Sequence, residues 1–271
     1  MVNLVADGAA QFEQGCPAGV DAHWSDARIP RRHGAMPIPL SFPQQRVYFL
    51  DQIGSGSAYN MSASLWLTGP LDERALALSL DELRRRHDIL RTTFHMQGER
   101  PAQAVSPPQA NDLPVIDLTA HPASTRAAEA MRLATEEAAQ PFDLANGPLF
   151  RAKLIRLAPE ERAFLLTMHH IISDGWSIDI LYTELRQIYD AFRERRASPL
   201  KELTIQYGDF AVWQHQSLEA GVLARQINYW IGRLDNLPLA CTFPTDRSRP
   251  AIQSYRGAIH QVSIDRPLID K

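Results

Sequence analysis

The chain has 271 residues, 45% of them hydrophobic and 22% charged, a composition that is ordinary for a globular protein and excludes collagen, coiled coil and wholesale disorder. Its 28 basic and 31 acidic residues leave a formal net charge of -3, so charge alone attracts neither nucleic acid nor an anionic membrane. The two cysteines, Cys16 and Cys241, lack metal-ligand spacing, and the sequence contains neither a signal peptide nor an apolar run of membrane-spanning length. These features predict a cytoplasmic protein without a structural metal.

Residues 1–38 form the first segment of the predicted organisation. They are rich in Ala, Gly, Asp, Arg and Pro and show no sustained periodicity, so we expect a flexible leader there. Ser41 can cap the first helix of the remainder, residues 39–271. In chain order the patterns predict a helix over residues 42–50, a strand over 59–67, a helix over 72–87, a strand over 89–96, a loop with a short strand over 101–114, a helix over 122–140, strands over 149–157 and 163–168, helices over 177–195, 205–216 and 221–234, and a final strand over 258–264.

Two neighbouring apolar runs favour a sheet as the centre of the fold. Residues 149–157 and 163–168 are separated by a short segment of turn-forming residues, and we expect them to pair as adjacent strands. The helix over residues 177–195 carries its apolar side chains on one face and should pack against that sheet. We therefore predict an α/β fold, an α+β sandwich in one domain, with a mixed sheet and one layer of helices packed on it.

The segment richest in chemistry is MHHIISDGWS, residues 168–177, between the last apolar strand and the following helix. Because side chains alternate along a strand, His169 and His170 point to opposite faces, and only one of them can face a given cleft. An imidazole is the natural general base at neutral pH. Asp174 lies four positions after His170, where it can bend the turn or bind an arginine, and Gly175 permits backbone angles that other residues resist.

The residues alone leave a structural role for the two histidines as open as a catalytic one. A metal site is disfavoured, because the chain has no HExxH motif and no third ligand at a diagnostic spacing. Tyr207, Phe210 and Trp213 recur at every third position, which places them on one face of a helix as core residues.

Residues 169–175 (HHIISDG) resemble the HHxxxDG signature of condensation domains from nonribosomal peptide synthetases, members of the chloramphenicol acetyltransferase-like superfamily. The resemblance extends from about residue 40 onward and implies a single lobe of that family's fold. Three other segments resemble the family in the same order: residues 41–50 (SFPQQRVYFL) its SxAQxRLWFL-type helix, residues 86–94 (RHDILRTTF) its RHExLRTxF segment with Asp88 in place of glutamate, and residues 207–213 (YGDFAVW) its YxDFAVW helix.

The resemblance implies a reaction between two thioesters, in which the amine of an aminoacyl acceptor attacks a donor acyl group and forms an amide. Each substrate would arrive on the 4′-phosphopantetheine arm of a donor or an acceptor carrier protein, and no cofactor would be bound directly. By its place in the motif, His170 is the catalytic residue and His169 is a structural neighbour. Two roles stay open for His170, general base and positioner of the nucleophile.

The resemblance also implies supporting roles for other residues of the loop. Asp174 is expected to be held by an arginine, because a buried aspartate without such a partner would be costly. Arg91 is the preferred partner and Arg256 the alternative. Gly175 is expected to let its backbone amide approach the reacting centre.

Condensation domains consist of two similar lobes, and the resemblance identifies residues 39–271 with the N-terminal lobe, truncated before the C-terminal lobe. The seam between the lobes would then be exposed and apolar, which predicts self-association and little or no activity of the isolated chain. Two other functions stay open. One is a freestanding coenzyme A-dependent acyltransferase of the same superfamily, and the other is a non-catalytic half-domain or remnant that binds a carrier protein or the partner lobe.

Overall fold

The structure is a computed structural model, and it describes residues 29–32, 37–54, 56–110, 112–218, 223–237, 244, 246–248 and 262–264. The chain divides into two units, residues 1–227 and 228–271, and the functional residues discussed below lie in the first. In chain order the described elements are β1 (Ile38–Pro39), α1 (Phe42–Gln52), β2 (Asn60–Thr68), α2 (Glu73–Arg86), the 3₁₀ turn η1 (Asp88–Arg91), β3 (Thr92–Gln97), β4 (Arg100–Val105), β5 (Val115–Asp117), α3 (Ala123–Ala139), β6 (Phe150–Ala158), β7 (Glu161–His169), α4 (Gly175–Arg193), α5 (Tyr207–Ser217) and α6 (Leu223–Leu234).

The larger sheet has four strands in the order β2-β7-β6-β5. β7 pairs antiparallel with β2 and with β6, whereas β5 joins β6 in parallel, so the sheet is mixed as predicted. Every residue from 163 to 169 in β7 is buried, which explains the continuous apolar run, because a strand covered on both faces has no polar side. β2 lies at the edge of the sheet and alternates between partly buried and exposed residues.

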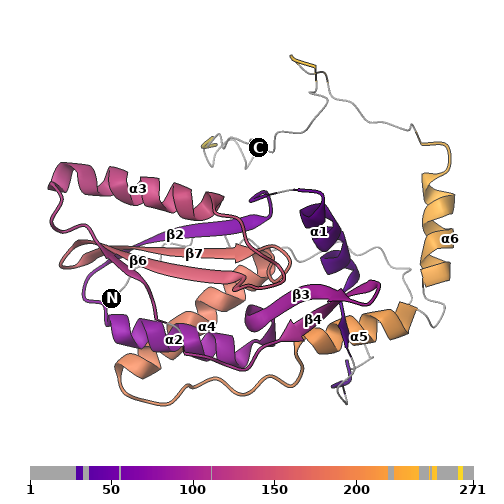
Figure 1. Ribbon diagram of the computed structural model, residues 1–271, viewed down its shortest axis with the longest axis horizontal. Coiled ribbons are helices and arrows are strands. Elements are labelled where there is room, and N and C mark those ends of the chain that lie inside the picture. The colour runs from indigo at the N-terminus through magenta and orange to yellow at the C-terminus, as the bar shows by residue number, and fades with distance from the viewer. Residues whose placement is uncertain are drawn as a thin grey trace. The chain divides into compact units, whose positions relative to one another are not determined.

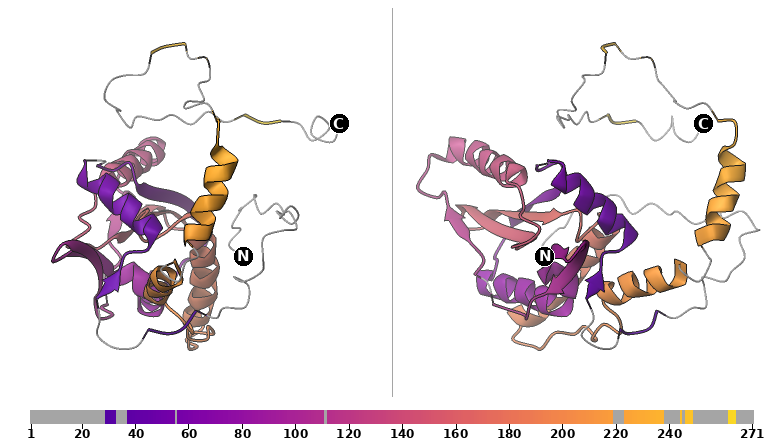
Figure 2. Two further views of the ribbon diagram at one scale, coloured as in Figure 1. Left: turned by 90° about the vertical axis from the view of Figure 1, so that its right-hand side faces the viewer. Right: turned by 45° about the vertical axis from the view of Figure 1, so that its right-hand side comes forward.

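Helices cover both faces of this sheet (Figure 1). On one face α3 packs over β6 and β7, where its Ala130 meets Ile155 and Leu165. On the other face α2 and α4 pack together, and Phe164 and Leu166 of β7 join their leucines in the main core. Both views of Figure 2 keep α3 and α2 on opposite sides of the strands. The expected single layer of helices is therefore wrong, because β6 and β7 present apolar side chains to both faces.

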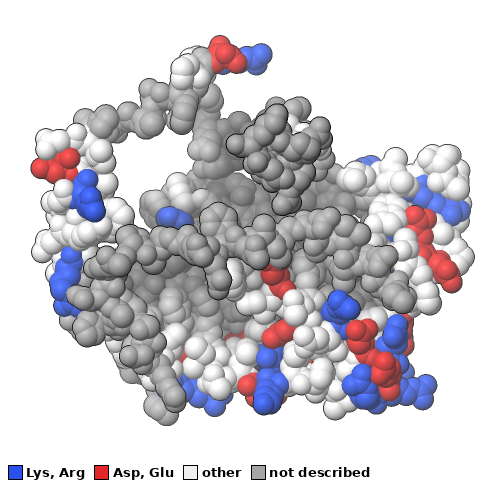
Figure 3. All heavy atoms as spheres, turned by 180° about the vertical axis from the view of Figure 1, so that it is seen from behind, with Lys and Arg blue, Asp and Glu red and all other residues white. Residues whose placement is uncertain are grey.

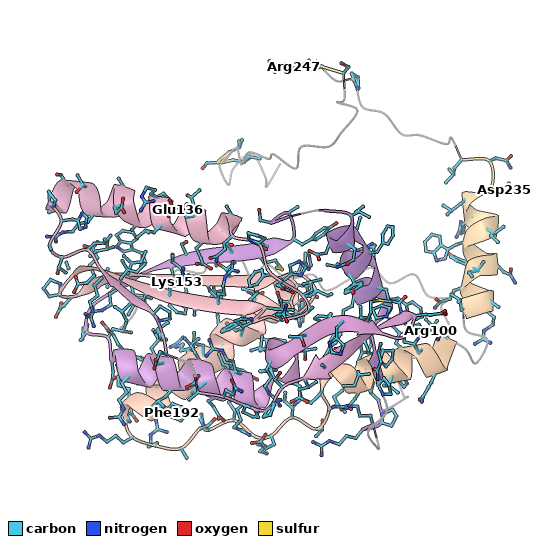
Figure 4. The ribbon with its side chains drawn as sticks, in the orientation of Figure 1. Arg100, Glu136, Lys153, Phe192, Asp235 and Arg247 are labelled. Atoms are coloured by element: carbon cyan, nitrogen blue, oxygen red, sulfur yellow. The ribbon has the colours of Figure 1, made fainter. Side chains whose placement is uncertain are left out.

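An ion cluster joins α3 to the sheet beneath it. The carboxylate of Glu137 on α3, whose side chain is only 3% exposed, binds Arg151 and Lys153 of β6. Figure 4 shows Lys153 on its strand below α3. Arg151 also donates to the backbone carbonyls of Pro141 and Gln140, so it holds the segment in which the chain leaves α3.

The smaller sheet has three antiparallel strands in the order β1-β4-β3, and α5 packs against β1. A Cβ at Gly208 would lie 3.3 Å from Cγ2 of Ile38, so glycine permits this close approach of helix and strand. The buried carboxylate of Asp209 accepts the backbone N–H of Arg32 at 3.1 Å. Arg32 and Ile38 belong to the segment predicted as leader, but Ile38 lies in β1 and Arg32 is bound to Asp209.

Most predicted elements occur where the sequence places them, including the hairpin of β6 and β7 and the capped helix α1. The strand expected over residues 89–96 is shorter, because the 3₁₀ turn η1 occupies its first part. The last predicted strand, residues 258–264, falls outside the described residues except for 262–264, which are not in a strand. Most of the leader also lies outside the described residues.

Charged side chains of both signs lie interspersed on the face shown in Figure 3, where the described residues form no patch of a single sign. None of the helices within the described ranges combines the length and the hydropathy needed to cross a membrane.

Candidate functional site

The site is built where β7 ends and the chain turns toward α4. His169 is the last residue of β7 and is fully buried, on the strand face that Leu165 shares with α3. His170 follows in the turn and is exposed. The backbone N–H of His170 donates to the carbonyl of Tyr59 at 2.8 Å, so the turn begins at a fixed point next to β2. The predicted divergence of the two histidines is confirmed.

His170 is held with one ring nitrogen toward the protein. Nδ1 lies 2.8 Å from the carbonyl oxygen of Ser173, and because a carbonyl can only accept, Nδ1 carries the proton. In the neutral ring Nε2 therefore keeps its lone pair, and no hydrogen bond from the described residues engages it. This is the tautomer that a general base requires.

His169 has the opposite tautomer. Its Nδ1 accepts the backbone N–H of Ile171 at 3.1 Å, so in the neutral ring the proton lies on Nε2. Burial and, to a lesser extent, the nearby His170 together lower the pKa of His169 to about 4, so the ring is neutral at physiological pH. Phe142 and Tyr59 pack around the imidazole, with ring centroids 6.0 and 6.3 Å away. His169 is thus a buried, neutral group at the end of β7.

Helix α1 supports the same loop from the side. Ser41 caps α1 by accepting the N–H of Gln44, and the Gln44 side chain accepts the N–H of Ser41 at 2.9 Å in a capping box. The amide of Gln44 also donates to the carbonyl of Ile171 at 3.2 Å. In Figure 1, α1 lies beside the end of β7 at which the chain leaves the sheet. One buried glutamine therefore connects the helix cap to residues 169–175, the histidine loop.

Asp174 does not bind Arg91, so the predicted ion pair is wrong. The Asp174 carboxylate is exposed and caps α4, accepting the N–H and the hydroxyl of Ser177 at 2.8 and 2.6 Å. The Ser177 hydroxyl and N–H, together with His170, hold the pKa of Asp174 below its usual value. Arg91 is engaged locally, by the carboxylate of Asp88 and by the carbonyls of Arg84 and Ser106. An aspartate that is solvated and capping a helix needs no arginine.

The other two predicted residues of the site are Arg256 and Gly175. Arg256, the alternative partner of Asp174, lies outside the described residues. Gly175 is the first residue of α4, has no unusual backbone angle, and would place a Cβ within 4 Å of no other residue. Backbone freedom is therefore not what this position needs in the structure.

His170 lines a cavity of about 470 Å³. Its walls come from α1, the histidine loop, α4 and the segment leading into α5, and they are mostly apolar. Tyr207 and Phe210, expected in the core, are only half-buried and line this cavity. Tyr207 reaches back to Ser41, with 2.9 Å between the two hydroxyl oxygens. The aromatic face of α5 is thus a cavity wall as much as a core surface.

A polar network that the sequence did not reveal forms another part of the wall. His87 lines the cavity and its Nε2 lies 2.6 Å from Oε2 of Glu184, which also accepts Nε of Arg86 at 3.0 Å. Gln206 donates to the carbonyl of Arg86 and accepts the N–H of Asp88. His87 belongs to the RHDILRTTF segment, but its partner Glu184 is 97 positions away, so no local pattern could reveal the pair.

Among the described residues, no group of three or more His, Cys, Asp or Glu side chains is placed to hold a metal ion. The cavity itself offers the imidazoles of His170 and of His87, the latter bound to Glu184, together with other hydrogen-bonding groups and an apolar wall that can hold a substrate in place.

Comparison with known proteins supports the resemblance seen in the motifs. The Condensation domain family matches residues 35–271. The chain is 42% identical over 233 residues to the chondramide synthase cmdD of Chondromyces crocatus, covering 85% of this chain and 6% of the synthase. It is 40% identical to the phosphinothricin tripeptide synthetase PhsC of Streptomyces viridochromogenes, covering 90% of this chain and 23% of that protein. The chain thus spans a small part of the length of these relatives.

Solved structures agree in fold. The X-domain from teicoplanin biosynthesis superposes with a TM-score of 0.76 at 28% identity, covering 85% of this chain and 50% of that chain. The starter condensation domain of the rhizomide synthetase RzmA superposes with a TM-score of 0.69 at 22% identity and shows the shared fold, covering 76% of this chain and 49% of that chain. The chain therefore spans about half of these domains. The family match, the relatives and the single-lobe fold together show that this chain belongs to the condensation-domain family of nonribosomal peptide synthetases.

Proposed function

We propose that the site forms the amide bond of nonribosomal peptide synthesis, joining an acyl or peptidyl donor to an aminoacyl acceptor while both are thioesters on carrier proteins. The observation that carries this proposal is the fixed tautomer of His170, whose Nδ1–H is bound to Ser173 and whose Nε2 is left for the cavity. Membership of the condensation-domain family supports the reaction class.

The chemistry asks little of the protein beyond orientation and one proton acceptor. The acceptor nitrogen attacks the donor carbonyl carbon, the C–N bond forms, and the C–S bond breaks. Nε2 of His170 takes the proton that the amine loses, and the departing thiolate is protonated in turn. Holding two thioesters in reacting geometry contributes a large share of the rate, and proton transfer contributes about 100-fold or more.

Both substrates are delivered to the site by partner proteins. Each would be presented on the 4′-phosphopantetheine arm of a donor or acceptor carrier protein. The apolar wall beside His170 favours such an arm over water as the occupant of the cavity. Because the chain spans about half of the solved condensation domains, we propose that the other half completes the walls and excludes water. The isolated chain is then expected to have little or no activity.

Reconstitution tests this function. The purified chain is mixed with loaded donor and acceptor carrier proteins, with and without the separately expressed second half of the domain, and the product is followed by intact mass. A parallel arm replaces the donor carrier with the same acyl group on coenzyme A. We expect peptidyl carrier only when both halves and both carriers are present. Transfer from coenzyme A to a free amine would identify a freestanding acyltransferase instead. Carrier binding without product, from a folded complex of both halves, would identify a non-catalytic module.

A further inference from the structure

The histidine loop contains a buried donor with no acceptor. The His169 side chain is 1% exposed, and its Nε2 has no hydrogen-bond partner among the described residues. Because Nδ1 accepts from Ile171, Nε2 is the nitrogen that carries the proton. A buried N–H left unpaired costs about 1–3 kcal/mol, so the position calls for an acceptor.

The charged group nearest to that proton comes from α1. Oδ1 of Asp51 lies 3.9 Å from Nε2 of His169, and the Asp51 side chain is 18% exposed. This separation exceeds a direct hydrogen bond, but a small side-chain rotation or one bridging water spans it. The other carboxylate oxygen is 3.4 Å from the amide of Gln52, so Oδ1 is the oxygen free to serve His169. Burial raises the pKa of Asp51, as expected for a carboxylate withdrawn from water.

We propose that Asp51 is a positioning residue that accepts a hydrogen bond from Nε2–H of His169 and thereby sets the geometry of the loop that carries His170. A carboxylate at this place favours the Nε2–H tautomer, which leaves Nδ1 unprotonated to accept the N–H of Ile171. That bond holds the turn in which the carbonyl of Ser173 accepts a hydrogen bond from Nδ1–H of His170. The tautomer of one histidine thus supports that of the next.

In this proposal α1 contacts the loop through residues near both ends of the helix. Gln44, near the N-terminus of the helix, donates to the carbonyl of Ile171, while Asp51, near its C-terminus, faces His169. Two contacts from one rigid helix fix the turn better than either alone, because the loop cannot pivot about a single point. The catalytic consequence rests on the proposed function, whereas the tautomer does not.

Asn60 is the competing acceptor. It lies directly opposite His169 in the pairing of β2 with β7, and its side-chain oxygen is also buried without a partner. Its amide nitrogen, however, donates to the carbonyls of Ala138 and Gln140 at 2.8 Å each, which fixes the side chain toward the end of α3. A neutral amide oxygen also favours the Nε2–H tautomer less strongly than a carboxylate.

Nitrogen NMR of the chain labelled with ¹⁵N-histidine tests the proposal directly. Two-bond ¹H–¹⁵N correlations report which ring nitrogen carries the proton, and His169→Gln assigns the signal. We expect Nε2–H in the wild-type chain and in Asp51→Asn, which keeps an acceptor oxygen. Asp51→Leu is expected to shift the ring toward the Nδ1–H tautomer, and Asn60→Ala is expected to leave it unchanged. In the complete domain Asp51→Leu should lower kcat about 10-fold with little change in KM, with Asp51→Asn recovering most of it.

Two results would overturn the role of Asp51: His169 signals that stay unmoved in Asp51→Leu, or signals that move in Asn60→Ala instead. If Asp51→Leu does not fold, Asp51→Ala removes both carboxylate oxygens with a smaller side chain and is read in the same way. Because the tautomer is measured without substrate, its result stands apart from the proposed function. A complete domain that is inactive even as wild type, while the tautomers respond as predicted, would count against the proposed function and not against the Asp51 contact.

Discussion

His169 and His170 carry their protons on different ring nitrogens, and the groups around each ring account for the difference. A backbone N–H points at Nδ1 of His169, whereas a backbone carbonyl points at Nδ1 of His170. The end of β7 then separates their environments, with one ring buried and the other exposed beside the cavity. Two adjacent residues of one type therefore differ in tautomer and in exposure.

The buried imidazole makes stability depend on pH. Folding lowers the pKa of His169 from 6.5 to about 4, so the unfolded chain binds this proton at a higher pH than the folded chain. The stabilisation is complete above pH 6.5 and is lost progressively as pH falls toward 4, by about 3 kcal/mol in all. Urea unfolding between about pH 7 and pH 5 measures this slope. His169→Gln should be less stable at neutral pH but show a shallower slope, and an unchanged slope would contradict the assignment.

The corrected partner of Asp174 can be tested at the same scale. Asp174→Ala should cost about 1 kcal/mol through loss of the α4 cap. In a double-mutant cycle measured by urea unfolding, Asp174→Ala and Arg91→Ala should be additive within about 0.5 kcal/mol, because the two side chains share no contact. The cycle of Arg91→Ala with Asp88→Ala is the matched control and should show coupling. Strong coupling between Arg91 and Asp174 would restore the ion pair expected from the sequence.

The residue-level predictions succeeded where local rules apply and failed where partners are distant. Strand alternation predicted that only one of the two histidines would face the cavity, and this holds although His170 lies in the turn just beyond β7. The partner of Asp174 was missed because helix capping and ion pairing make the same demand on sequence, an acid near a turn. Gln44 was missed as a support of the loop because its acceptor, Ile171, is 127 positions away.

At the scale of elements, α1 and the histidine loop are held together by hydrogen bonds of one side chain. Gln44 is 2% exposed and serves both the helix cap and the carbonyl of Ile171. Gln44→Glu keeps an acceptor for the N–H of Ser41 but cannot donate to Ile171, and it buries a charge. We expect it to lose about 1–3 kcal/mol of stability in urea and to slow the complete domain. Gln45→Glu, on the half-buried neighbouring position, is the control; equal effects of the two variants would argue against the link.

Helix and strand positions were largely predictable because their periodicities are strong, as in the central hairpin of β6 and β7. The arrangement of these elements in space was less predictable from the sequence. A continuous apolar run in β7 is compatible with cover on one or both faces, and only the position of α3 opposite α2 and α4 decides between them. The parallel edge strand β5 has three residues, too few for a periodic signal.

At the scale of the molecule, apolar side chains are exposed beside the site. Trp176 at the start of α4 is 80% exposed and Phe49 on α1 is 64% exposed, which is unusual for such large side chains unless another surface covers them. We expect the purified chain to self-associate with rising concentration in sedimentation velocity, and Phe49→Lys with Trp176→Lys to reduce this. Adding the second half of the domain should replace self-association with a defined complex. A strictly monomeric chain would contradict the exposed seam.

The proposed reaction depends on Nε2 of His170 acting on the reacting amine. The most direct test is the single-turnover rate of peptidyl transfer in the complete domain, comparing wild type with His170→Ala and with His121→Ala, an exposed histidine outside the cavity. We predict a loss of about 100-fold or more for His170→Ala and an unchanged rate for His121→Ala. A His170→Ala domain that is folded, binds both carriers and transfers at the wild-type rate would contradict this role.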